Sequence, residues 1–141
     1  MMKNPKELLL EYLDAFTTSP QQAAALFAED ARLELPFMES VGLAPVYTGP
    51  AEIQQMLEKV LSLVPDWQFK NTQVFIETED QVAAEYEAYG NTSHTKRPFY
   101  NLFFGRLVSD NGKIKLLREG HNPLWTARTL FENGLSDIPK A

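Results

Sequence analysis

Two groups that can carry a proton near neutral pH stand close together in the last third of the sequence, Glu119 and His121. Residues two apart on a β-strand point to the same face of a sheet, so both side chains can reach one site. An apolar pocket raises the pKa of a carboxylic acid, and an imidazole titrates close to neutrality, so the pair suits acid–base catalysis. The alternatives are an ion pair of Glu119 with Arg106 or with residues of the neighbouring strand, and a hydrogen-bonded His121 at the sheet edge.

Tyr12 is a third candidate, because a tyrosine hydroxyl can donate a hydrogen bond to an oxyanion that forms during a reaction. It lies on the apolar stripe of a predicted helix, where the alternative is a core tyrosine whose hydroxyl is satisfied inside the protein. We expect apolar side chains to line a ligand pocket beside these groups. The predicted ligand contacts are Phe16, Leu35, Met56, Val60, Trp67, Leu102 and Phe104.

We expect no metal and no cofactor at this site. The sequence has no cysteine, and its two histidines, His94 and His121, lack the spacing of a metal site. It also has no glycine-rich phosphate loop, no nucleophile elbow and no dinucleotide-binding motif. The chemistry is therefore expected to use side chains alone.

A β-hairpin must position Glu119 and His121. Residues 99–109 and 113–119 read as strands, and Asn111-Gly112 is a favoured two-residue turn between them. This turn pairs Asp110 with Lys113 and places Glu119 opposite Phe104, whereas a three-residue loop would reverse the faces. The face predicted to carry Glu119 also holds Tyr100, Leu102, Phe104, Arg106, Leu117 and His121.

The remaining elements predict an α+β fold. Apolar spacing and caps indicate helices that begin at Pro5, Pro20, Pro50 and Pro123. Further strands are expected over 31–37, 67–77 and 82–92, with a loop over 39–48. Helices lead and antiparallel strands follow, so we expect the helices on one face of a curved sheet that forms a cone with an apolar interior.

Two faces of the strand over 82–92 differ in polarity. Val82, Ala84, Tyr86 and Ala88 share one face. Glu85, Glu87 and Tyr89 share the other, which we expect to be solvated or part of an interface.

The bulk composition narrows the class of protein. The 141 residues fit a single domain over 1–141, and the net charge of −6 argues against nucleic acid or an anionic membrane as a partner. No apolar run approaches the roughly 18 residues of a membrane span. Glu7, Glu11 and Asp14 interrupt the first apolar segment, so we expect no signal peptide and a cytoplasmic location.

Three segments together resemble the NTF2-like superfamily, in its SnoaL-like and ketosteroid-isomerase-like branches. They are residues 25–31 (ALFAEDA), 47–50 (YTGP) and 110–114 (DNGKI). The resemblance implies a cone-shaped fold with three N-terminal helices packed on a strongly curved, mostly antiparallel sheet. It matches Tyr12 to the first-helix tyrosine of the steroid isomerases, while Leu35 and Phe104 occupy the positions of their two aspartates.

A narrower resemblance is to the PhzA/PhzB-type proteins of phenazine biosynthesis. It rests on residues 65–67 (PDW) with Asn71, on Tyr100-Asn101, and on residues 118–123 (REGHNP). It implies a dimer with an acid–base pocket that the glutamate matching Glu119 faces. Where that family has a histidine and a serine on its third helix, this sequence has Met56 and Val60.

These observations predict a homodimeric, cofactor-free acid–base enzyme of the isomerase, cyclase or condensation type. Its expected ligand is a cyclic or polyketide-like small molecule in an apolar pocket. Ile114 and Leu116 are expected on the outer sheet face, where they would form the dimer interface. The alternatives are a binding module without catalysis and a dimeric interaction domain.

Overall fold

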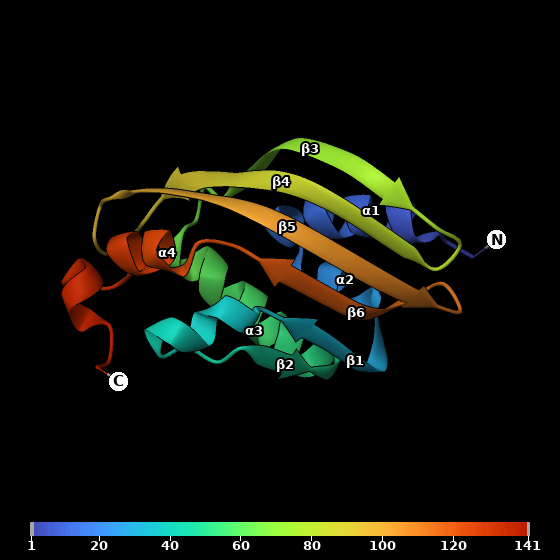
Figure 1. Cartoon of the computed structure of the whole chain (residues 1–141), viewed down its shortest axis with the longest axis horizontal. Helices are drawn as coiled ribbons and strands as arrows, with labels where there is room; N and C mark the ends of the chain where they lie inside the picture. The colour runs from blue at the N-terminus through green and yellow to red at the C-terminus, as the bar shows by residue number, and fades with distance from the viewer. Residues whose placement is uncertain (1, 141) are drawn as a thin grey trace.

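The computed structural model describes residues 2–140 and has helices at both ends of the chain around one six-stranded sheet (Figure 1). The α-helices are α1 (Pro5–Thr18), α2 (Pro20–Ala25), α3 (Gly49–Leu63) and α4 (Pro123–Leu130). The strands are β1 (Phe27–Glu34), β2 (Val46–Thr48), β3 (Gln68–Glu77), β4 (Gln81–Asn91), β5 (Pro98–Asp110) and β6 (Lys113–Gly120). Two short 3₁₀ helices, η1 (Pro36–Val41) and η2 (Gly134–Asp137), complete the fold.

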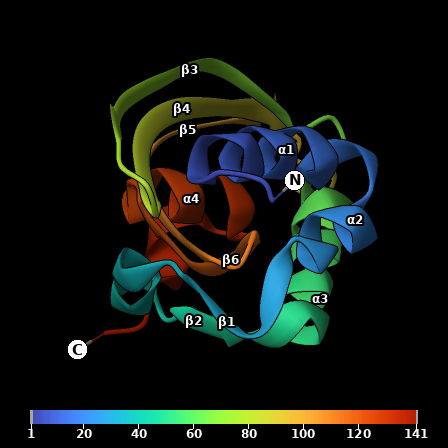
Figure 2. The ribbon, with the colours of Figure 1, turned by 90° about the vertical axis from the view of Figure 1, so that its right-hand side faces the viewer.

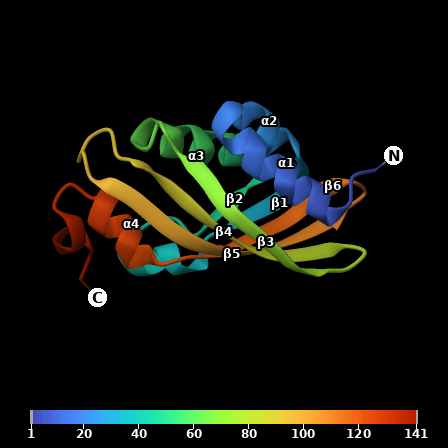
Figure 3. The ribbon, with the colours of Figure 1, turned by 90° about the horizontal axis from the view of Figure 1, so that it is seen from above.

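The sheet has the strand order β2-β1-β6-β5-β4-β3, and only the β1–β6 pair is parallel among the described strands. Figure 2 shows the sheet bending around α1, which lies inside the curve with α2 and α3 beside it. Figure 3 shows α4 at the end of the molecule opposite the N-terminus. The predicted α+β architecture with a curved, mostly antiparallel sheet is confirmed.

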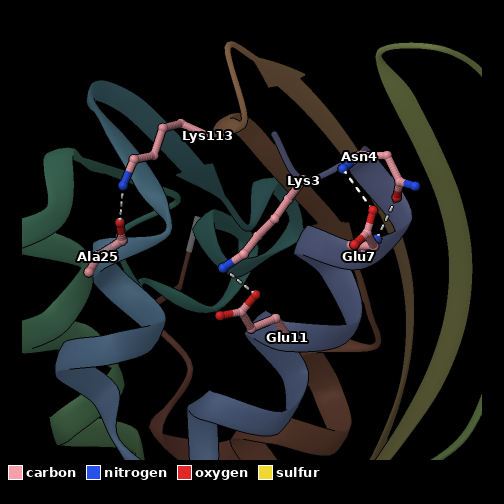
Figure 4. A network of polar contacts seen from close by, with 6 residues as sticks. All are labelled: Lys3, Asn4, Glu7, Glu11, Ala25 and Lys113. Carbon is pink, nitrogen blue, oxygen red and sulfur yellow. Dashed lines mark hydrogen bonds and ion pairs between the residues drawn. The ribbon is translucent and has the colours of Figure 1, made fainter. Parts of the chain in front are cut away.

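The first helix begins where its capping residues predict. The Asn4 side chain accepts a hydrogen bond from the Glu7 amide at 2.8 Å, and Glu7 accepts one from the Asn4 amide, which makes a capping box (Figure 4). Lys3 adds an ion pair to Glu11 at 2.6 Å. The side chain of Lys113, the first residue of β6, donates a hydrogen bond to the Ala25 carbonyl and so links α2 to the sheet.

The predicted helical stripe of α1 is the centre of the core. Leu8, Leu9, Tyr12, Leu13 and Phe16 are all buried against the inner face of the sheet. The face of β4 that Val82, Ala84, Tyr86 and Ala88 share is the inner one, since each of these residues is at most 1% exposed. The apolar inside of the cone is thus built from one helix and the middle strands.

A β-bulge in β6 corrects the predicted hairpin register. The turn itself is as expected, with positive φ at Asn111 and Gly112 and Asp110 paired with Lys113. The pairing then shifts by one residue, because Ser109 faces Ile114 while Val108 faces Leu116.

The bulge changes which residues share the face of Glu119. Glu119 pairs with Gly105 and not with Phe104. The residues predicted on its face from β5 were therefore wrong: Tyr100, Leu102, Phe104 and Arg106 lie on the outer face. The inner face carries Phe99, Asn101, Phe103, Gly105 and Leu107.

The same bulge turns Ile114 inward, where it is fully buried, so the prediction of Ile114 on the outer face was also wrong. Leu116 is half-buried.

Two other elements differ from expectation. The predicted strand over 31–37 is β1, which starts earlier at Phe27 and ends earlier at Glu34. The predicted loop over 39–48 contains the second half of η1 and all of β2.

The end of the cone that holds α4 is covered by a small second apolar cluster. Met38 and Val41 of η1 pack with Ala127 of α4 in this cluster.

Within residues 2–140, no helix combines the length and the hydrophobicity that crossing a bilayer requires.

Candidate active site

An apolar cavity of about 90 Å³ lies inside the cone, next to Glu119. An engineered apolar cavity of about 150 Å³ accommodates benzene, so a ring-sized ligand requires lining side chains to move. Met38 and Met56 have the flexible side chains for such a movement. The cavity is lined by Tyr12, Phe16, Leu35, Met38, Met56, Val60, Trp67, Phe69, Phe99, Phe103, Glu119, His121, Thr126 and Leu130.

Glu119 is the acidic group of this cavity. It points inward from β6 and is 5% exposed. The Tyr86 hydroxyl donates a hydrogen bond to its Oε2 atom, and no second partner of the carboxyl group is found among residues 2–140. Burial raises the pKa of Glu119 to about 7, although the hydrogen bond from Tyr86 works in the opposite direction. The carboxyl group can therefore both hold and release a proton near neutrality.

Tyr86 and Gly105 position this carboxyl group, and sequence reasoning assigned neither of them to the site. A Cβ atom on Gly105 would overlap the Tyr86 hydroxyl, so only glycine leaves room for Tyr86 to reach Glu119. The ring of Tyr86 stacks on Phe103 with centroids 5.8 Å apart. A usable signal was present: Tyr86 stands between Ala84 and Ala88 on a strand face whose other members are small or apolar.

Tyr12 reaches the cavity from α1. Its ring is 1% exposed and packs edge-on against Phe16 and Phe27. The pKa of Tyr12 is raised well above 10, mainly because the hydroxyl group is buried and to a smaller extent because the Glu119 charge is nearby. The hydroxyl group therefore stays protonated and is able to donate a hydrogen bond.

His121 follows the last residue of β6 and lies against the cavity wall. Its ring stacks on Phe103 with centroids 4.8 Å apart, and its Nε2 atom is 3.1 Å from the Met38 sulfur. Burial lowers the pKa of His121 to about 4, so the imidazole is neutral at physiological pH. It can accept or relay a proton, but it does not contribute a positive charge to the site.

The alternative of an ion pair between Glu119 and Arg106 is wrong. Arg106 lies on the outer face of the sheet, where its Nε atom donates to the Gln81 side chain at 2.9 Å. None of the cavity-lining side chains, all within residues 2–140, is a lysine or an arginine. The site therefore has no fixed positive charge to offset ionisation of Glu119.

Five of the predicted ligand contacts line this cavity: Phe16, Leu35, Met56, Val60 and Trp67. The placement of Leu102 and Phe104 on its wall was wrong, because both lie on the outer face and Phe104 is 52% exposed. The lining residues that were not predicted are Met38, Phe69, Phe99, Phe103, Thr126 and Leu130.

A second glutamate–tyrosine cluster lies on the outer face of the same sheet. Glu87 accepts hydrogen bonds from Tyr100 at 2.7 Å, Tyr89 at 2.9 Å and Asn71 at 2.9 Å. These hydrogen bonds lower the pKa of Glu87, and the bond from Tyr100 has the largest effect. Glu87 is thus a stable carboxylate, in contrast to Glu119.

Comparison with known proteins identifies the family. Residues 9–117 match the family model of the SnoaL-like domain, so the chain belongs to the SnoaL-like domain family with its NTF2-like fold. A search of curated protein sequences found no match.

Solved structures share this fold. The phenazine biosynthesis-related protein PhzB2 of Pseudomonas aeruginosa has a TM-score of 0.77 and 24% identity, over 96% of this chain and 86% of that one. A candidate isomerase of Bacillus subtilis gives 0.80 and 20%, over 92% and 94%. A candidate polyketide cyclase of Xanthomonas campestris gives 0.69 and 21%, over 82% and 87%. The predicted resemblance to the SnoaL-like and PhzB-type proteins is confirmed at the level of the fold.

Proposed function

We propose that this protein is a cofactor-free acid–base enzyme that moves a proton between carbon atoms of a cyclic small molecule. The proposal rests on one observation about Glu119. Its carboxyl group is buried on an apolar cavity, and this burial raises the pKa of Glu119 to about 7. A base with this pKa is half ionised near neutral pH, where general base catalysis is most efficient. Structural neighbours named as an isomerase and a polyketide cyclase support the same class of chemistry.

The proposed step begins with ionised Glu119, which takes a proton from a carbon next to a carbonyl group. The C–H electron pair forms a carbon–carbon double bond, and the carbonyl π pair moves to oxygen, which becomes an enolate. In a substrate with a β,γ carbon–carbon double bond, this enolate is a dienolate. As the carbonyl re-forms, the new double bond settles between the α and β carbons, and the former β,γ π pair takes the proton from Glu119 at the γ carbon. Tyr12 is the proposed donor to the enolate oxygen, because its hydroxyl remains protonated beside the cavity. His121 is proposed to relay the proton as a neutral imidazole.

The test uses cyclohex-3-enone, a ring-sized ketone whose isomerisation to cyclohex-2-enone requires this proton transfer. Wild-type protein should catalyse the conversion in D₂O with deuterium incorporation, and the rate should rise with pH and level off above about 7. The Glu119→Gln variant keeps the shape of the side chain but has no titrating group, so it should lose the activity. Unchanged exchange in this variant would contradict the assignment of Glu119 as the base.

A second candidate function is small-molecule binding without catalysis. Met56 and Val60 favour it, because two cavity positions on α3 carry apolar side chains that cannot transfer a proton. In this case ring-sized ketones should bind while deuterium exchange stays at the solvent rate. The same experiment therefore separates the two functions.

We further propose that the protein forms a homodimer through its outer sheet face. Phe37, Phe75 and Phe104 are 56%, 55% and 52% exposed there, around a groove that Arg106 and Arg118 also line. Exposed aromatic clusters of this kind usually mark an interface. Light scattering at micromolar concentration should give a dimer mass, and Phe104→Glu should shift it to the monomer. A monomeric wild-type protein would contradict the proposal.

A further inference from the structure

Two residues that line the cavity each have a buried polar side-chain atom with no hydrogen-bond partner within residues 2–140. The atoms are Nε1 of Trp67 and Nδ1 of His121. Trp67 is 7% exposed and His121 is 8% exposed, so bulk solvent does not satisfy them. Leaving such a group unpaired is unfavourable, because its lost hydration is not replaced. Buried polar groups without partners are rare, and two on one cavity suggest that the ligand supplies the missing partners.

The two atoms have opposite hydrogen-bonding roles. The indole Nε1 of Trp67 is a donor only. The Nε2 atom of His121 lies 3.1 Å from the Met38 sulfur, which offers it only an acceptor, so Nε2 carries the hydrogen of the neutral ring. The Nδ1 atom of His121 is then left with a free electron pair. The site therefore presents one donor and one acceptor.

Both rings flank the same aromatic side chain. The centroid of Phe103 lies 6.3 Å from that of Trp67 and 4.8 Å from that of His121. The donor and the acceptor are therefore brought together by the residue that precedes β3 and the residue that follows β6. Both side chains line the same cavity.

The charge of the cavity restricts the ligand further. Its lining contains a carboxyl group, Glu119, and a neutral histidine, with no lysine or arginine among the described residues that form it. Transfer of an anion into such an apolar, uncompensated site is strongly unfavourable. A ligand that carries a carboxylate is thus disfavoured.

We propose that the cavity binds a neutral ring that carries both a carbonyl oxygen, which accepts from Trp67 Nε1, and a hydroxyl or N–H group, which donates to His121 Nδ1. This names the substrate class of the proposed enzyme and rests on the proposed function only in taking the ligand to be the substrate. The binding itself makes no use of ionised Glu119.

Four benzene derivatives of similar size test the recognition: 3-hydroxyacetophenone, acetophenone, 3-ethylphenol and ethylbenzene. The dissociation constants should rank with 3-hydroxyacetophenone tightest and ethylbenzene weakest, and each polar group should contribute roughly three- to tenfold. 3-Hydroxybenzoate, which is charged, should bind at least about tenfold more weakly than 3-hydroxyacetophenone.

Two variants assign the partners. Trp67→Phe keeps an aromatic ring without the N–H group, so the ratio of affinities for acetophenone and ethylbenzene should fall to about one. His121→Phe should remove the advantage of 3-ethylphenol over ethylbenzene in the same way. Because each ratio is taken within one variant, any general change in cavity shape affects both ligands and cancels.

An NMR measurement on tryptophan-labelled protein provides an independent readout. The indole proton of Trp67, identified by its loss in Trp67→Phe, should shift downfield with acetophenone but not with 3-ethylphenol. Unchanged affinity ratios in both variants, or tightest binding of 3-hydroxybenzoate, would overturn the proposal and leave bound water as the partner of these atoms.

The affinity series is measured in Glu119→Gln as well as in the wild type. If the ranking holds in both proteins but no exchange of cyclohex-3-enone occurs, the substrate-class inference stands and the proposed enzymatic function fails. If exchange depends on Glu119 but the ranking is absent, the function stands and this inference fails.

Discussion

Each face of the sheet carries a glutamate bonded by tyrosine, yet the two carboxyl groups differ in their acidity. On the inner face, Glu119 accepts one hydrogen bond from Tyr86, and its pKa is raised to about 7. On the outer face, Glu87 accepts three hydrogen bonds, including those from Tyr89 and Tyr100, and its pKa is lowered. A tyrosine partner is therefore common to both and does not determine the direction of the shift.

The pKa values differ because burial dominates at Glu119, whereas three hydrogen bonds dominate at Glu87. Removing a carboxylate from water disfavours its charged form, and a single hydrogen bond offsets only part of this cost. Glu119 is buried on an apolar cavity, whereas Glu87 lies on the solvent-facing side, half-buried among its donors. The cone thus converts an ordinary glutamate–tyrosine pair into a group that can exchange a proton at neutral pH.

The largest expected effect is on catalysis. Glu119→Gln should reduce the exchange of cyclohex-3-enone by about 10²–10⁴-fold, the usual contribution of a positioned base. Glu87→Gln makes the same chemical change in the outer cluster and should leave the rate unchanged. Comparable losses in both variants would show that the two clusters do not differ as described.

The next effect is on the pH dependence of stability. The folded protein holds the proton of Glu119 up to about pH 7, whereas the unfolded chain releases it near 4.5. Glu119 therefore adds to the free energy of unfolding in full below about pH 4.5, and this stabilisation is lost as the pH rises to about 7. At roughly 1.4 kcal/mol per pH unit for one proton, it amounts to about 3 kcal/mol.

His121 makes a contribution of similar size with the opposite sign. Its pKa falls from 6.5 to about 4 on folding, so its contribution is present above pH 6.5 and is lost as the pH falls to about 4. Urea unfolding between pH 4 and 8 should therefore give opposite slopes in the two variants. Stability should rise with pH in Glu119→Gln and fall with pH in His121→Phe. Parallel slopes would contradict the account.

A smaller effect is expected from Gly105→Ala. The new methyl group would displace the Tyr86 hydroxyl from Glu119, which should cost about 1–3 kcal/mol in unfolding free energy and raise the pKa of Glu119 further. Gly120→Ala is the control, since its Cβ atom would lie 3.2 Å from the exposed ring of Phe37, which can move. Equal destabilisation by both substitutions would argue against a specific role of Gly105.

The sequence allowed the fold to be predicted well because its signals are local. The capping box of Asn4 and Glu7, the stripe of α1 and the turn at Asn111-Gly112 are each determined by a few neighbouring residues. Alternation along β6 likewise put Glu119 and His121 on one face with Leu117, and it holds beyond the bulge. The family resemblance, and not a local signal, put that face inside the cone.

The parts of the site that were missed depend on contacts between strands. The bulge adds Lys115 to β6 without a turn or glycine to mark it, so the pairing of Glu119 with Gly105 was not predictable from the hairpin. This single shift explains why Leu102 and Phe104 were assigned to the cavity in place of Phe103. The Tyr86–Glu119 bond joins residues on two strands that are not neighbours in the sheet order, β4 and β6, and no local pattern reveals it.

The most direct test of the central claim is a titration of Glu119 itself. Infrared difference spectra between wild type and Glu119→Gln isolate the C=O stretch of the protonated carboxyl group, with Glu87→Gln recorded as the outer-face control. The account predicts a Glu119 band that persists above pH 6 and disappears with a midpoint near 7. A midpoint at or below 4.5, the ordinary value, would contradict it, because the cavity would then hold a carboxylate at every physiological pH.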